Sequence, residues 1–179
     1  MNFDSGENDD FLTLKMQGNT YMKDNQFLKA IKRYTTALSK LPSIEKSSNE
    51  DIKNRLITLS NRAEGFLKLG YIYASLKDCE EILEENKKYL SLLDISQIDK
   101  VINRKARSKE QLATNLEDIN KIDKIYDLMS EKSKNQFNLE NIKKTLNEKK
   151  NNMRGIFNRK EMLSYEKTCF DIINAQNII

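Results

Sequence analysis

The sequence predicts an all-α fold built from paired helices, and three observations carry that prediction. Only 5 glycines and 1 proline occur among 179 residues, and residues that favour helices dominate. Few stretches alternate apolar and polar residues as a half-buried strand does. A helix-turn-helix pattern recurs along the chain, which is typical of repeats of about 34 residues. The charged fraction of 32% against 38% hydrophobic suits a thin solenoid, because a solenoid exposes much of each helix.

The first helix pair is predicted over residues 11–44, where the chain reads LKMQGNTYMKDNQFLKAIKRYTTALSKLP from Leu14 to Pro42. Asp24 and Asn25 are expected to form the turn. Pro42 ends the second helix, because proline cannot continue a helix interior. The two helices can approach closely at the small residues Gly18 and Ala30. The groove between them is filled by Tyr21, Tyr34 and Leu38.

Two further units are predicted over 56–88 and 98–131. The second contains ITLSNRAEGFLKLGYIYASLKDCEEIL, and the Ser-, Asn- and Glu-rich linker before it predicts an extra loop or an extended helix end. The third is expected to begin at Ser96 as N-cap. Its helical apolar spacing is carried by Val101, Leu112, Leu116, Ile119, Ile122 and Tyr126.

The two ends of the chain differ from the repeats. Residues 1–10, MNFDSGENDD, are acidic and are predicted to be disordered. Residues 135–179 are predicted to form a C-terminal helical extension, as an extended or capping helix. The apolar residues spaced for one face of it are Leu139, Ile142, Leu146, Met153, Ile156 and Phe157.

The composition excludes several classes of function. Histidine, the commonest general base and metal ligand near neutral pH, is absent. Cys79 and Cys169 lack a CxxC context and are expected to be reduced thiols, with Cys79 buried as a small apolar residue. Neither a Gly-rich phosphate loop, a nucleophile elbow nor a metal-ligand spacing occurs. We therefore expect no enzyme, no cofactor and no metal, and, without a long apolar run or a basic leader, a cytoplasmic location.

The helix-turn-helix units resemble tetratricopeptide (TPR) repeats. The residues at TPR consensus positions are Leu14, Gly18, Tyr21, Ala30, Tyr34, Ala37 and Pro42 in the first unit and Ala63, Phe66, Gly70, Ser75, Cys79 and Ile82 in the second. The resemblance implies a TPR domain over 11–130, as an all-α helix-turn-helix solenoid of about three repeats with a C-terminal extended or capping helix. In such solenoids the first helix of each repeat lines a concave binding surface.

Five polar residues on these first helices form a recognisable set. Lys15 and Asn19 are four residues apart and share one helix face, as do Lys100 and Arg104. Asn61 lies on the first helix of the second unit. The set resembles the two-carboxylate clamp of TPR co-chaperones, which follows the pattern Lys-x-x-x-Asn, Asn, Lys-x-x-x-Arg.

The resemblance implies a ligand and a role for each residue. The ligand would be the C-terminal Glu-Glu-Val-Asp peptide of a cytosolic heat-shock chaperone of the ninety or seventy kilodalton class. Lys15, Asn19 and Asn61 would hold its main-chain carboxylate. Lys100 would bind the terminal Asp side chain, and Arg104 would add a bond to the peptide. Lys and Arg supply charge-assisted hydrogen bonds, whereas Asn supplies directed neutral donors.

Two other interpretations remain open at this point. The chain is also compatible with a TPR scaffold that binds another peptide or protein partner without the clamp. The basic stretch from Lys143 to Lys160 is compatible with binding to nucleic acid or an anionic membrane. A solvated helix face is the simpler interpretation of that stretch, since the net charge is only +4. We therefore expect neither nucleic acid nor membrane as a partner, and the sequence does not identify a client protein or second partner.

Overall fold

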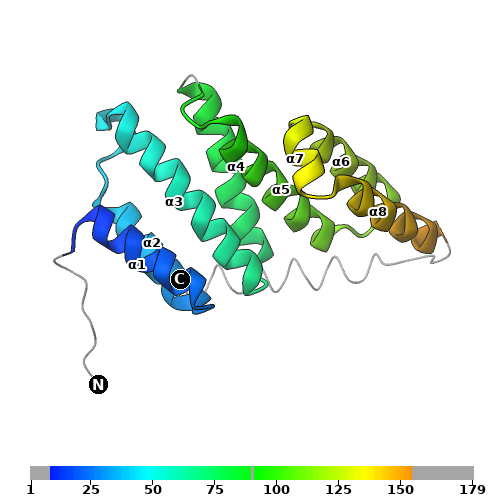
Figure 1. Cartoon of the computed structure of the whole chain (residues 1–179), viewed down its shortest axis with the longest axis horizontal. Helices are drawn as coiled ribbons and strands as arrows, with labels where there is room; N and C mark the ends of the chain where they lie inside the picture. The colour runs from blue at the N-terminus through cyan, green and yellow to red at the C-terminus, as the bar shows by residue number, and fades with distance from the viewer. Residues whose placement is uncertain (1–8, 90, 155–179) are drawn as a thin grey trace.

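The chain forms a row of antiparallel helix pairs (Figure 1). The computed structural model describes residues 9–89 and 91–154. The described helices are α1 (Phe11–Lys23), α2 (Phe27–Lys40), α3 (Asn49–Lys68), α4 (Ile72–Lys88), α5 (Ile95–Leu112), α6 (Leu116–Asp127), α7 (Glu131–Gln136) and α8 (Leu139–Arg154), with a 3-10 turn at Ile44–Lys46. This architecture of sequentially paired helices confirms the all-α prediction.

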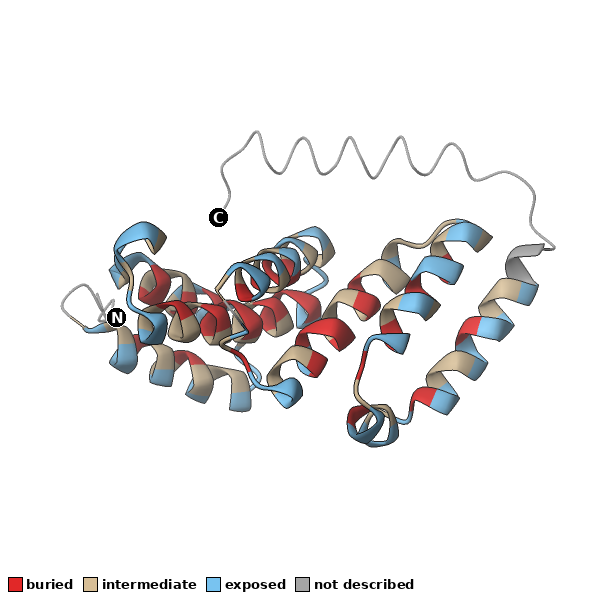
Figure 2. Ribbon diagram, turned by 90° about the horizontal axis from the view of Figure 1, so that it is seen from above, coloured by how far each residue is buried: buried red, intermediate tan, exposed pale blue. Residues whose placement is uncertain are grey.

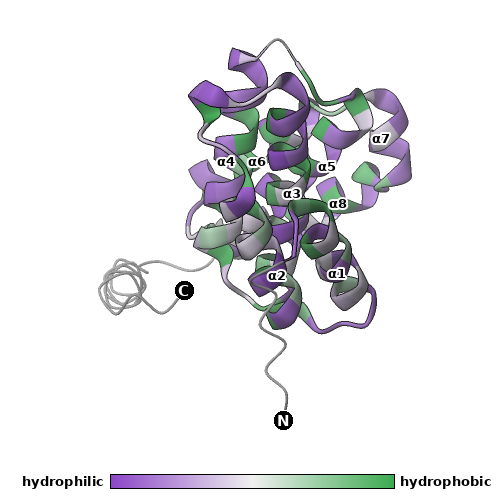
Figure 3. Cartoon of the chain, turned by 90° about the vertical axis from the view of Figure 1, so that its left-hand side faces the viewer, coloured by the Kyte–Doolittle hydropathy of each residue, from purple (hydrophilic) through white to green (hydrophobic). Residues whose placement is uncertain are grey.

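The first helices of the three pairs, α1, α3 and α5, contact one another in order. Helix α2 packs on α1 and α3, and α4 packs on α3 and α5. Buried residues face the interior between the helices (Figure 2), and the outward faces are largely hydrophilic (Figure 3). Helix α5 separates two hydrophobic clusters: Val101 belongs to the cluster around α3 and α4, and Ile102 to the cluster around α6 and α8.

The first pair begins and ends where its sequence predicts. The carboxylate of Asp10 accepts a hydrogen bond from the backbone N–H of Thr13 and caps α1. Asn25 adopts a left-handed φ of 57° in the turn, a conformation that Asn tolerates better than most residues. Leu41 is extended, as the residue before Pro42 must be, and α2 ends there.

The connection between the first and second pairs consists of a loop with the 3-10 turn Ile44–Lys46, followed by an N-terminal extension of α3. Helix α3 starts at Asn49 because Ser48 and Asp51 form a reciprocal capping box. Arg55 on the extension donates to the backbone carbonyl of Pro42 at 2.7 Å. The added turns of α3 therefore lie against the end of the first pair.

The second pair is fastened by one ion pair with two hydrogen bonds. Arg62 of α3 donates to both carboxylate oxygens of Asp78 on α4, at 2.9 and 2.8 Å. Burial raises the pKa of Asp78 despite this partner. Cys79, next to it, is fully buried, and burial raises the pKa of its thiol to about 12. Cys79 is therefore a buried apolar side chain, as predicted; Cys169 lies outside the described residues.

The third pair begins two residues before the predicted cap. Ser96 lies inside α5, and its assignment as N-cap is wrong. Asp94 caps the helix instead, because its carboxylate accepts from the N–H of Gln97 while the Gln97 side chain accepts from the N–H of Asp94. A capping box with Asp and Gln uses both side chains at once, whereas Asp99, three residues after Ser96, is engaged by Ser130.

Helices α7 and α8 follow the third pair, and the short α7 has no counterpart in the predicted elements. Ser130 caps α7 and also donates to the buried carboxylate of Asp99 through its backbone N–H, at 3.1 Å. Leu139 and Leu146 of α8 are buried in the second cluster, as their spacing predicts. The side chain of Met153, and Ile156 and Phe157, lie outside the described part of the chain.

The described part reaches two residues into the segment 1–10. Asp10 caps α1, and the carboxylate of Asp9 accepts from Gln17 at 2.8 Å. Residues 1–8 lie outside the description. Among the helices that are described, none has an apolar stretch long enough to cross a bilayer.

Substitution of Gly18 by Ala tests the close approach of α1 to α2. A Cβ at Gly18 would lie only 2.5 Å from Cε1 of Tyr34. Alanine favours the helix, but displacing a buried ring outweighs that gain, and we expect a net loss of about 1–3 kcal/mol in the free energy of unfolding. Urea denaturation measures it. Thr20→Ala, at an exposed site on the same helix, is the control, and equal stability of both variants would contradict the packing argument.

Candidate functional site

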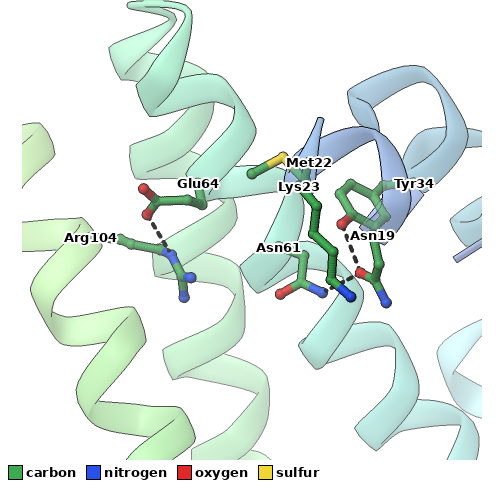
Figure 4. A pocket seen from close by; sticks show the side chains of 7 residues that line it. All are labelled: Asn19, Met22, Lys23, Tyr34, Asn61, Glu64 and Arg104. Atoms are coloured by element: carbon green, nitrogen blue, oxygen red, sulfur yellow. Dashed lines mark hydrogen bonds and ion pairs between the residues drawn. The ribbon is translucent and has the colours of Figure 1, made fainter. Parts of the chain in front are cut away.

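A pocket of about 290 Å³ lies where the first helices of the three pairs, α1, α3 and α5, meet (Figure 4). Its lining residues come from α1, α2, α3 and α5 and are Asn19, Met22, Lys23, Tyr34, Asn61, Glu64 and Arg104. Three of the five residues predicted from the sequence, Asn19, Asn61 and Arg104, therefore line one pocket. They are supplied by three successive first helices.

Asn19 is oriented by two neighbours. Its Oδ1 accepts from the hydroxyl of Tyr34 at 2.8 Å and from Nδ2 of Asn61 at 3.1 Å. An amide whose oxygen is engaged in this way turns its Nδ2 to the opposite edge, as Figure 4 shows. The N–H groups of Asn19 and the second N–H of Asn61 are then the amide donors that remain for a ligand.

Tyr34 serves as the neutral donor in this network. The ring is almost fully buried, and burial raises the pKa of Tyr34 to about 12, although Arg104 and Asn61 act in the opposite direction. The phenol therefore keeps its proton over the whole physiological range. It donates to Asn19 and leaves the donors of that amide available.

Arg104 is held on the opposite wall by residues of α3. Its Nε donates to Glu64 at 3.0 Å, and its Nη1 donates to the hydroxyl of Ser60 at 2.7 Å. Arg107, one turn further along α5, contacts the same carboxylate at 3.2 Å. These bonds bridge α3 and α5 across the face that carries the pocket.

Lys15 lies one turn before Asn19 and does not line the pocket. Its Nζ donates to Oδ1 of Asn54 at 2.9 Å and lies 5.5 Å from the ring centroid of Phe11. Burial lowers the pKa of Lys15, and the nearby carboxylate of Glu50 partly offsets that effect. Asn54 belongs to the added turns of α3, so this extension determines where the ammonium of Lys15 lies.

Lys100 lies one turn before Arg104 on α5, is exposed and does not line the pocket. No carboxylate of the described residues pairs with it. The structure thus brings Asn19, Asn61 and Arg104 together and leaves Lys15 and Lys100 one turn away on the same helices.

Sequence reasoning missed Lys23 and Glu64 as pocket residues and treated Tyr34 only as a packing residue. Lys23 continues the spacing of Lys15 and Asn19 by another four residues, which is a readable signal for the same helix face. Glu64 is three residues after Asn61, but its pairing with α5 spans 40 residues of sequence and has no local signature.

The described residues were compared with the arrangement that a metal site needs, and the sequence with known proteins. No group of three or more Cys, Asp or Glu side chains there is arranged to hold a metal ion. The sequence matches no protein-family model and no curated protein. The pocket is therefore interpreted from its own donors and charges.

Tyr34→Phe tests the role of the hydroxyl. The neutral phenol is favoured in the folded state, so its contribution to stability is complete below the unfolded pKa of about 10 and is lost as the pH rises towards the folded value of about 12. We expect the variant to lose about 1 kcal/mol of stability at pH 8. Between pH 10 and 12 its free energy of unfolding should decline less than that of the wild type. Thermal unfolding over this range measures both. Tyr71→Phe, at an exposed site, is the control, and identical pH profiles for Tyr34→Phe and the wild type would contradict the assignment.

Proposed function

We propose that this chain is a TPR-type adaptor, not an enzyme, whose pocket binds the C-terminal carboxylate of a partner protein. The observation that carries the proposal is the convergence of Asn19, Asn61 and Arg104 on one pocket from three successive first helices. Because the Oδ1 of Asn19 is already engaged, Asn19 and Arg104 offer only donors to a ligand, and Asn61 adds the second N–H of its amide. A carboxylate suits this set because it combines two acceptor oxygens with a negative charge.

The partner we propose is the Glu-Glu-Val-Asp tail of a cytosolic heat-shock chaperone of the ninety or seventy kilodalton class, which places this protein in the cytosol. Lys15 and Lys100 extend the donor set beyond the pocket on the same helices. A terminal Asp has two carboxylates close together, and a row of amides and cations on adjacent helices suits such a group. Capture of a short exposed tail corresponds to a Kd of about micromolar order.

The basic C-terminal region supports nucleic-acid or membrane binding less well. Three lysines of α8 are used to attach that helix to its neighbours. Lys143 pairs with Asp127 at 2.6 Å, and Lys150 pairs with Asp123 at 3.5 Å. Lys149 donates to the backbone carbonyl of Glu110 at 2.8 Å. Cations that are engaged in this way give less attraction to a polyanion than free ones.

A calorimetric titration with a free-acid Glu-Glu-Val-Asp peptide and its C-terminally amidated twin tests the proposal. We expect a Kd of about micromolar order for the free acid, weakening with added salt, and no binding of the amide, because the amide lacks the charged acceptor. Equal binding of both peptides, or of neither, would be evidence against the proposal.

Asn19→Ala is the loss-of-binding variant for the same titration. Asn120→Ala, at an exposed position on α6, is its matched control. Circular dichroism establishes that both variants remain helical before the affinities are compared. A tail that binds Asn19→Ala as well as it binds the wild type does not use this pocket.

Lys100→Ala separates binding from folding. Because Lys100 is exposed and pairs with no described carboxylate, we expect the melting temperature to stay unchanged. We expect the affinity for the free-acid peptide to fall by roughly 3- to 10-fold, since one charge-assisted bond is lost. For a peptide that ends in Asn, the affinity should fall less from the wild type to Lys100→Ala, because Lys100 is assigned to the Asp side chain. The exposed Lys124→Ala variant controls for net charge, and the same loss in both lysine variants would remove this assignment.

A further inference from the structure

Glu64 is the acidic residue of the pocket, and basic side chains surround it. Its carboxylate accepts from Nε of Arg104 at 3.0 Å and from Nη1 of Arg107 at 3.2 and 3.3 Å. Lys68, one turn along α3, lies 4.0 Å away. The side chains of Glu64 and Arg104 are only 19% and 14% exposed, so solvent screens this pair less than an ordinary surface ion pair.

The carboxylate of Glu64 is ionised at neutral pH. Burial acts to raise its pKa, but Arg104 and Arg107 outweigh burial, and the pKa of Glu64 lies below its usual value. A carboxylate beside two guanidiniums occupies the kind of position that a ligand carboxylate would take. Glu64 thus resembles a bound anion that belongs to the protein itself.

The bonds of Arg104 limit what it offers to a ligand. Nε is used by Glu64 and Nη1 by Ser60, so among the described residues only Nη2 lacks an acceptor. Figure 4 shows the carboxylate of Glu64 beside the guanidinium of Arg104, across the pocket from Asn19. An anion that enters the pocket either binds Nη2 or competes with Glu64 for the other donors of Arg104, and in both cases it lies near a second negative charge.

We propose that Glu64 is a specificity-determining residue that competes with the carboxylates of the ligand for Arg104 and weakens the binding of acidic tails. This inference rests on the proposed function of the pocket as a carboxylate site. The ligands it disfavours are those with several acidic groups near the terminus, because each added negative charge is repelled by the same carboxylate. Tails that rely on the terminal carboxylate, bound by the amides of Asn19 and Asn61, are affected least.

Glu64→Gln is the variant that isolates the charge. The Gln side chain keeps an oxygen that accepts from Nε of Arg104, and it removes the negative charge. We expect the free-acid Glu-Glu-Val-Asp peptide to bind this variant about 3- to 10-fold more tightly at low salt, and the gain to shrink as salt is added. A second peptide that ends in Asn, with its free main-chain carboxylate, should gain less.

Glu80→Gln is the matched control. Glu80 of α4 also contacts two cations of α5, Lys105 at 3.4 Å and Lys109 at 3.9 Å, but it does not line the pocket. The Glu80→Gln substitution also removes one negative charge from an ion-paired glutamate that contacts α5. We expect its affinity for both peptides to match that of the wild type. An equal gain in both variants would show a general charge effect and overturn the proposal.

The remaining outcomes separate this inference from the proposed function. If the wild type binds the free acid and not the amide, but Glu64→Gln binds no more tightly, the inference is wrong and the carboxylate site stands. If no variant distinguishes the free acid from the amide, the carboxylate site itself is wrong and the role of Glu64 falls with it. Glu64→Ala provides a second variant should Glu64→Gln fail to fold. Loss of folding in both would identify Glu64 as a structural residue and also overturn the inference.

Discussion

The contact between the backbone of Gly18 and the ring of Tyr34 fixes how the amide of Asn19 lies in the pocket. Because Gly18 has no Cβ, the ring packs directly on α1. Its hydroxyl then meets Asn19, which is the next residue along, at 2.8 Å. Asn19 in turn accepts from Asn61 and joins α1 to α3. The packing of α2 on α1 therefore orients the Asn19 amide, which lies where the first pair meets α3.

Polar bonds, and not only apolar packing, join the first helices on this face. Asn61 connects α3 to α1, and Arg104 connects α5 to α3 through Ser60 and Glu64. Burying such groups costs desolvation, and apolar residues of similar volume often serve as well or better for stability alone. Stability alone therefore does not require these residues. A set of partly satisfied donors has the advantage that it can exchange its internal partners for those of a ligand.

The sequence predicted those features that depend on neighbouring residues. The turn at Asn25, the helix end before Pro42 and the burial of Cys79 follow from local backbone preference or side-chain type, and each is confirmed. The N-cap of α5 was predicted at Ser96 and lies at Asp94, where the reciprocal bonds with Gln97 start the helix two residues earlier. Contacts between distant segments have no such local signal: the resemblance named Asn19, Asn61 and Arg104 together, but Glu64 was not predicted.

Glu64 illustrates that limit best, since its charge is visible in the sequence and its partners are not. On α3 alone it reads as a surface acid, and only the packing of α5 places Arg104 and Arg107 beside it. The carboxylate of Glu64 lowers the net charge of the pocket, which is also lined by the cations Lys23 and Arg104. A pocket with one net positive charge and several oriented neutral donors attracts polyanions only weakly. The proposed ligand, a single chain terminus, fits these properties better than an extended phosphate backbone does.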